Sequence, residues 1–169
     1  MAHWRKLERD GVGLSILDFG GDGPSVLFLH GLAGHAGEWS ETASWLTADH
    51  RVLALEARGH GRSERRPQDL APEAQIADVA FVLTEVADGP AALVGQSLGG
   101  VTAMLVAARH PELVSALVMA DAAAGEGVTG GQAATAVGDG LGSWPVPVPS
   151  YQAVAEYFRV RFGARAAAV

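Results

Sequence analysis

The stretch ALVGQSLGGVTAM, from Ala92 to Met104, places one serine among glycines where a short apolar run gives way to a longer one. The first run, Ala91 to Val94, is typical of a strand that is covered on both faces. The second run, Val101 to Ala108, is apolar nearly all round, which is typical of a helix buried on most sides. Between them, Gly95-Gln96-Ser97-Leu98-Gly99 matches the pattern G-x-S-x-G in a strand–turn–helix context. The sequence therefore predicts that Ser97 lies at the tip of a tight turn.

The rest of the chain alternates short apolar runs with segments of helical spacing. A turn motif, Asp10-Gly11, comes before the first of these runs. Asp10-Gly11 lies between two alternating segments and predicts a β-hairpin with a type I′ turn. Three further runs predict buried strands, at Ser25–Leu29, Val52–Leu55 and Leu117–Ala120, and helical spacing covers 38–46 and 72–86. We therefore expect an α/β fold: a mostly parallel sheet with an antiparallel N-terminal hairpin and helices on both faces.

The composition of the chain changes after Asp121, where the sequence becomes rich in glycine and then in proline. Proline-rich sequence forms neither a helix interior nor a central strand. We expect a core domain over 1–124, followed over 125–169 by a linker and the start of a cap region. Apolar residues at helical spacing predict a helix from Tyr151 to Phe162.

Composition narrows the classes of partner. The 169 residues carry a formal net charge of −7 and contain no cysteine. A negative charge disfavours nucleic acid and anionic membranes, and the lack of cysteine excludes disulfides and thiolate metal sites. The N-terminus lacks the apolar core of a secretory signal, and no apolar run is long enough to span a membrane. A small-molecule substrate and a cytoplasmic location are the expectations.

The glycines around Ser97 have a steric reason. In a turn this tight, side chains at Gly95 or Gly99 would collide with neighbouring backbone, and the serine itself would adopt a strained conformation. The helix that begins there points its amino end at the serine, so the N–H of Leu98 can donate to a developing oxyanion. The alternative interpretation is that Ser97 is an ordinary small turn residue, because short Gly/Ser patterns recur by chance.

Two more stretches of sequence favour a catalytic role for Ser97 over that of an ordinary turn residue. The run SVLFL ends in His30-Gly31-Leu32-Ala33-Gly34, and VLAL is followed by EARGHGRSE over 56–64. With the serine turn, these three motifs occur in family order, and the chain resembles the α/β-hydrolase fold superfamily from about Trp4 to Asp121. The likeness is greatest to its branch of small-molecule serine hydrolases, which includes esterases, lactonases, cofactor-free haloperoxidases and carbon–carbon bond hydrolases.

The resemblance implies a role for each matched residue. Ser97 would be the nucleophile, Leu98 and Leu32 would supply oxyanion N–H groups, and His30 and His60 would be structural residues that brace loops. The resemblance implies no cofactor. The reaction would proceed through acylation of the serine and attack of water on the acyl-enzyme, so a carboxylic ester or related acyl compound is the expected substrate.

The chain also departs from the family pattern. Glu56 stands where the family usually carries Asp, and families with a carboxylate nucleophile have Asp where Ser97 stands. The triad acid and histidine of the family follow later strands, and neither position occurs before Val169, so we expect an N-terminal part of a hydrolase that is inactive by itself. Asp121 is an alternative triad acid, although a loop-capping role is the simpler interpretation. His35 lies in the predicted oxyanion loop and is left unassigned.

Other classes of function remain as alternatives. A non-catalytic member of the same fold, acting as a ligand-binding or interaction protein, is compatible with the missing base. A nucleotide site would need a glycine spacing or a P-loop lysine that the sequence lacks, and the spacing of His30, His35 and His60 matches no metal signature. Finally, Ala116 to Ala120 predicts a flat apolar edge strand, through which copies of the chain could self-associate.

Overall fold

The computed structural model describes residues 2–122 and 150–162, and the chain divides into two units, Met1–Ala124 and Gly125–Val169. The described part of the second unit is helix α5 (Tyr151–Phe162), with the bounds that the spacing predicts. Residues 125–149 and 163–169 of the predicted linker and cap region over 125–169 lie outside the described residues.

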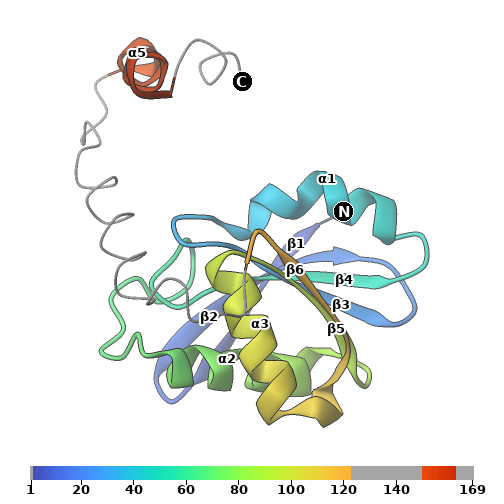
Figure 1. Ribbon diagram of the computed structural model, residues 1–169. Helices are drawn as coiled ribbons and strands as arrows, with labels where there is room; N and C mark the ends of the chain where they lie inside the picture. The colour runs from blue at the N-terminus through green and yellow to red at the C-terminus, as the bar shows by residue number, and fades with distance from the viewer. Residues whose placement is uncertain (1, 123–149, 163–169) are drawn as a thin grey trace. The chain divides into compact units, whose positions relative to one another are not determined.

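A six-stranded sheet forms the centre of the first unit (Figure 1). Its strands are β1 (His3–Arg9), β2 (Val12–Gly20), β3 (Ser25–Leu29), β4 (Arg51–Glu56), β5 (Ala91–Gln96) and β6 (Val114–Ala120). They lie in the order β1-β2-β4-β3-β5-β6. The pairs β1–β2 and β2–β4 are antiparallel, and β4, β3, β5 and β6 are mutually parallel. The predicted fold class is confirmed.

The N-terminal hairpin closes at the predicted turn. Asp10 and Gly11 both have positive φ, at 51° and 78°, as a type I′ turn requires, and Arg9 pairs with Val12. This turn matches the right-handed twist of the two strands, so β1 and β2 stay in register from His3 to Asp18. The hairpin therefore adds an antiparallel edge to an otherwise parallel sheet.

Helices cover both faces of the sheet, as predicted (Figure 1). On one face, a 3-10 turn η1 (Ala36–Trp39) and helix α1 (Ser40–Leu46) pack over Val26, Phe28 and Val52. On the other face, α2 (Pro72–Val86) and α3 (Leu98–Arg109) enclose the larger apolar core. A short 3-10 turn, η2 (Pro111–Leu113), leads from α3 into β6.

The chain leaves one predicted buried strand uncovered. The run LVMA was expected to be buried, but β6 is the last strand of the sheet and Val118 in it is 51% exposed. Residues 115–118 of this strand are all exposed. The position of β6 at the end of the sheet explains its exposure. Among the described elements, only β5 pairs with β6, and α3 is the only helix of four or more residues that packs against it. In the described ranges, no helix has both the length and the apolar character that crossing a membrane requires.

Candidate active site

Ser97 occupies the turn between β5 and α3 in a conformation that few non-glycine residues adopt. Its φ is 49° and its ψ is −115°. Such a backbone costs on the order of 1–3 kcal/mol and persists only where the surroundings enforce it. Two backbone hydrogen bonds enforce it here: Ser97 N–H donates to the carbonyl of Ala120 at 2.9 Å, and Val101 N–H donates to the carbonyl of Ser97 at 3.1 Å. The expected strained turn is present.

The glycines on either side of Ser97 allow backbone segments to approach closely. A Cβ atom at Gly95 would overlap the carbonyl group of Gly99, and a Cβ atom at Gly99 would overlap the carbonyl oxygens of Leu29 and His30. The amino end of α3 is therefore pressed against the end of β3. A side chain at Gly95 would push α3 away from β5, and a side chain at Gly99 would push it away from the end of β3.

Sheet pairing brings the His30–Gly34 loop beside the serine turn. Strands β3 and β5 are parallel neighbours, with Leu29 opposite Gly95, so the residues that follow each strand emerge at the same edge. A Cβ atom at Gly31 would overlap the side-chain oxygen of Gln96, so this loop also packs tightly on the residue before Ser97. The structure thus unites two motifs that are more than 60 residues apart in the sequence.

A compact turn shapes the loop that contains Leu32. Gly34 N–H donates to the carbonyl of Gly31 at 2.9 Å, and Ala33 has a φ of 64°. Leu32 is 41% exposed. Leu98 is the first residue of α3, so its N–H has no acceptor within the helix. Two backbone segments with N–H groups therefore lie beside Ser97.

His30 is held in one tautomer by two backbone groups. Its Nδ1 lies 2.8 Å from the carbonyl oxygen of Gly31, and its Nε2 lies 3.1 Å from the N–H of Ala57. Since a carbonyl only accepts and an N–H only donates, the ring carries its proton on Nδ1 and is neutral. Burial lowers the pKa of His30, and the nearby His60 lowers it further. Both ring nitrogens are occupied, so His30 joins β3, the loop that follows it and the segment after β4.

The third motif forms the loop that follows β4. The ring of His60 lies 4.9 Å from the ring of His30, centre to centre, and its Nδ1 donates to the carbonyl of Arg58 at 3.1 Å. The Arg58 guanidinium is buried against the carboxylate of Asp78 in α2, with two hydrogen bonds of 2.6 and 2.8 Å. Arg9 of the hairpin donates to the same carboxylate at 2.8 Å. These contacts anchor the loop to α2 and to the hairpin.

Sequence reasoning missed this buried ionic cluster. Asp78 is 2% exposed and lies on the apolar side of α2 between Ile76 and Val79, and a charged residue among core positions needs a buried partner. The position of Asp78 was therefore the signal that could have identified it. Its two arginines come from 20 and 69 residues away, so no local pattern points to them.

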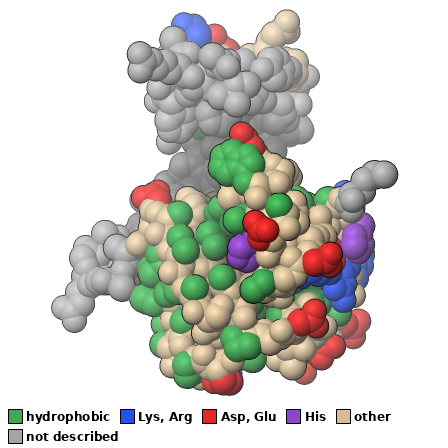
Figure 2. Space-filling view, turned by 90° about the vertical axis from the view of Figure 1, so that its right-hand side faces the viewer, with side chains coloured by type: hydrophobic (Ala, Val, Ile, Leu, Met, Phe, Trp, Pro, Cys, Tyr) green, Lys and Arg blue, Asp and Glu red, His purple; other side chains and the backbone are tan. Residues whose placement is uncertain are grey.

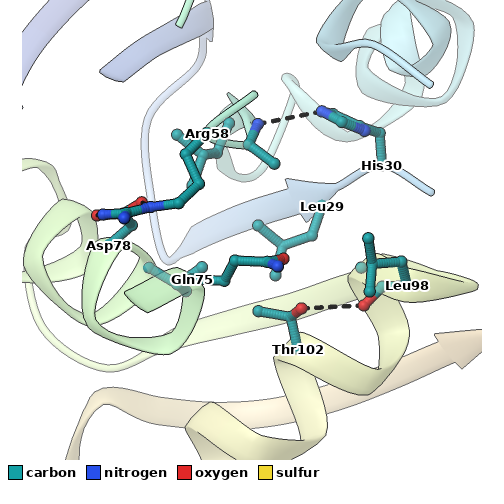
Figure 3. A pocket seen from close by; sticks show the side chains of 11 residues that line it. Leu29, His30, Arg58, Gln75, Asp78, Leu98 and Thr102 are labelled. Carbon is teal, nitrogen blue, oxygen red and sulfur yellow. Dashed lines mark hydrogen bonds and ion pairs between the residues drawn. The ribbon is translucent and has the colours of Figure 1, made fainter. Parts of the chain in front are cut away.

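A small cavity lies beneath the serine turn, between α2, α3 and the ends of β3 and β4 (Figure 3). It has a volume of about 20 Å³, enough for one or two waters, and Leu98, Gly99 and His30 are among the residues that line it. Ser97 is not part of its lining. Figure 3 shows Gln75 of α2 extending toward Leu29 and Leu98 across this space.

The remaining candidates take positions that the sequence did not specify. Asp121 directly follows Ala120, whose carbonyl holds Ser97 N–H, and it has a positive φ of 50°. His35 is exposed and caps the 3-10 turn that begins at Ala36. Within the described residues, no group of three or more acidic, histidine or cysteine side chains is arranged to hold a metal ion.

Comparisons with known proteins agree with this architecture. The family model described as "alpha/beta hydrolase fold" matches residues 24–138. The esterase Rv0045c of Mycobacterium tuberculosis is 39% identical over 109 residues, covering 64% of this chain and 36% of that protein. The sn-1-specific diacylglycerol lipase ABHD11 of Mus musculus is 38% identical over 109 residues, covering 63% of this chain and 35% of that protein.

A solved structure extends the likeness to nearly the whole chain. The crystal structure of E-2-(acetamidomethylene)succinate hydrolase superposes with a TM-score of 0.78 at 24% identity, over 96% of this chain and 59% of that one, and this likeness shows the fold alone. Because the family model covers more than half of its residues, this chain belongs to the α/β-hydrolase fold family. The chain spans little more than a third of the length of the two curated relatives.

Proposed function

We propose that this chain carries the nucleophile and the oxyanion donors of a serine hydrolase that acts on a carboxylic ester or a related small acyl compound. The observation that carries the proposal is the backbone of Ser97, which is strained, non-glycine and fixed between β5 and α3. A turn residue with no further role would be free to take a relaxed conformation or to be glycine. The relatives named esterase and lipase support the same class of substrate.

In the proposed mechanism, the hydroxyl oxygen of Ser97 attacks the carbonyl carbon of the substrate, and the carbonyl oxygen becomes an oxyanion. The N–H groups of Leu98 and Leu32 donate to it, Leu98 from the amino end of α3 and Leu32 from the loop after β3. The acyl-enzyme forms as the alcohol leaves, and water then hydrolyses it. No cofactor takes part in this sequence.

The proton of Ser97 needs a base, since a neutral hydroxyl is a weak nucleophile. His30 does not serve, because both of its ring nitrogens are engaged with backbone groups. We infer that the histidine and the acid of the triad come from residues outside those that the structure describes. The described residues alone would then show little turnover, because loss of a triad member costs several orders of magnitude in rate.

Turnover of nitrophenyl esters tests the proposal. A series from acetate to octanoate is assayed with the chain alone and with the chain combined with a C-terminal hydrolase segment that carries the later strands, the acid and the histidine of the family. We expect hydrolysis only in the second case, and we expect Ser97→Ala to abolish it. Ser40→Ala is the matched control, because Ser40 is an exposed serine at the start of α1. Ligand binding without any turnover in the combined protein would instead favour a non-catalytic binding protein.

A further inference from the structure

Glu56 is a buried acidic residue to which the proposed mechanism gives no role. It is the last residue of β4 and is 3% exposed. Its Oε1 accepts a hydrogen bond from the N–H of Ala36 at 3.1 Å, and its Oε2 accepts one from the N–H of Arg62. Ala36 and Arg62 belong to different loops, so one carboxylate connects the loop after β3 to the loop after β4.

The first of these loops carries Leu32. It leaves β3 at His30, turns between Gly31 and Gly34, and enters η1 at Ala36, which is completely buried. Its beginning is fixed by the bond from Ala57 N–H to His30, and its end is fixed by the bond from Ala36 N–H to Glu56. Both anchors are supplied by consecutive residues at the end of β4, Glu56 and Ala57.

The surroundings of the carboxylate are built for a glutamate. Gly61 has a φ of 49°, and a Cβ atom there would overlap the carboxylate group, so the loop after β4 closes directly over it. Within residues 2–122 and 150–162, no lysine, arginine or histidine forms an ion pair with Glu56. Its charge is met by main-chain N–H groups, and hydrogen bonds of this charge-assisted kind are about twice as strong as neutral ones.

We propose that Glu56 is a positioning residue that sets the geometry of the loop carrying the Leu32 N–H by bridging Ala36 and Arg62. The inference rests on the proposed function, because it assigns this loop to the oxyanion site. Length is the decisive property: a side chain shorter by one methylene reaches one of the two loops but not both. The family usually carries Asp at this position, and Glu56 is one methylene longer.

Amide hydrogen exchange of the ¹⁵N-labelled chain, followed by NMR, tests the bridge without requiring any activity. In Glu56→Asp and Glu56→Gln, we expect exchange at Ala36 or at Arg62 to accelerate about ten- to a hundredfold, because each variant keeps only one of the two bonds. The core amide of Leu27 should change much less. Glu38→Gln is the matched control, since Glu38 lies in the same loop but is exposed and accepts from His35 N–H. Exchange at Ala36 should be unchanged in that variant.

The proposal is overturned if exchange at both Ala36 and Arg62 is unchanged in both variants, or if it accelerates only as much as exchange at Leu27, which would indicate general destabilisation. Glu56→Gln keeps the size of the side chain, so it tests the bridge even if Glu56→Asp does not fold.

A second measurement separates this inference from the proposed function. The rate at which a fluorophosphonate modifies Ser97 in the combined protein is resolved into a binding constant and a maximal rate. A positioning role predicts that Glu56→Asp lowers the maximal rate about tenfold with little effect on binding. Lowered binding with an unchanged maximal rate would contradict the positioning role. If the unsubstituted protein is not modified, the proposed function fails, and the exchange experiment still decides the bridge.

Discussion

Strands β5 and β6 are paired neighbours of nearly equal apolar character, yet the chain treats them differently. Leu93 in β5 is completely buried, whereas its register partner Leu117 in β6 is 37% exposed. Strand β5 pairs on both sides, with β3 and β6, while β6 pairs only with β5. An apolar run therefore predicts a strand, but the neighbours that the fold supplies decide whether the strand is buried.

Strands β5 and β6 also differ in what they contribute to the serine turn. Strand β5 leads into a serine whose strained backbone is enforced by contacts from β3, α3 and the end of β6. Strand β6 contributes the carbonyl of Ala120 to that site and leaves its other edge free of any strand within the described residues. Figure 2 shows apolar side chains reaching the surface at several places on one face of the molecule.

Truncation of the paired leucines should give the largest difference. We expect Leu93→Ala to lower the free energy of unfolding by about 3 kcal/mol, because it opens a cavity in a closed core. Leu117→Ala should lower it by about 1 kcal/mol or less, since solvent already reaches that side chain. Urea denaturation of the two variants gives both values. Equal losses would mean that β6 is covered in solution.

Glycine substitution tests how tightly the serine turn is packed. Gly99→Ala should lower the free energy of unfolding by about 2 kcal/mol, because the new methyl group would overlap the carbonyl oxygens of Leu29 and His30. Gly13→Ala is the control, since nothing lies within 4 Å of a Cβ atom there and φ is not positive. Thermal unfolding of the two variants is the measurement. A stable Gly99→Ala protein would show that α3 is not pressed against β3.

The uncovered strand leads to a prediction about association. We expect the chain to self-associate at high concentration through the β6 edge, because a seven-residue strand without charge or proline is a template for pairing. Val118→Lys should shift sedimentation toward the monomer. Trp45→Lys is the control, because Trp45 is 71% exposed on α1, away from the edge. Association that survives Val118→Lys would place the contact elsewhere.

The smallest expected effect concerns pH. Burial lowers the pKa of His30 from its ordinary value of 6.5. Below that value the unfolded chain binds a proton that the folded chain does not, so stability should fall as pH decreases from about 7, by at most about 1.4 kcal/mol per pH unit. Urea denaturation at several pH values should show a smaller slope in His30→Gln. An unchanged slope would mean that His30 titrates normally in the folded protein.

Local signals in the sequence account for most of the fold. Asp10-Gly11 predicts the hairpin because only a few residue pairs tolerate two positive φ angles, and the apolar runs predict the strands because parallel strands are buried on both faces. The edge strand predicted at Ala116–Ala120 is confirmed, because β6 is the last described strand of the sheet and pairs only with β5. The exposure of its faces was not predicted, because it depends on which elements pack against the strand, and neither the composition nor the periodicity of LVMA contains that information.

For the candidate site, the sequence predicts the serine turn but not its supports. The G-x-S-x-G pattern indicates Ser97 because the backbone geometry demands glycine at fixed positions. Glu56 was noted only as a departure from the family pattern, and Arg58 and Asp78 were not recognised, because their contacts join segments that are 6 to 69 residues apart. Asp78 alone carried a local signal, a charge among the core positions of α2, and nothing local pointed to its arginine partners.

The chemical modification of Ser97 tests the central claim most directly. The chain is treated with a fluorophosphonate, alone and combined with a C-terminal hydrolase segment that carries the later strands of the family, and mass spectrometry locates the adduct. The account predicts an adduct on Ser97 in the combined protein, none in Ser97→Ala, and little or none in the chain alone. Rapid labelling of Ser97 in the chain alone would contradict the inference that the base lies outside the described residues, and His35 would then be the first histidine to replace. No adduct on Ser97 in the combined protein would contradict the claim that Ser97 is a nucleophile.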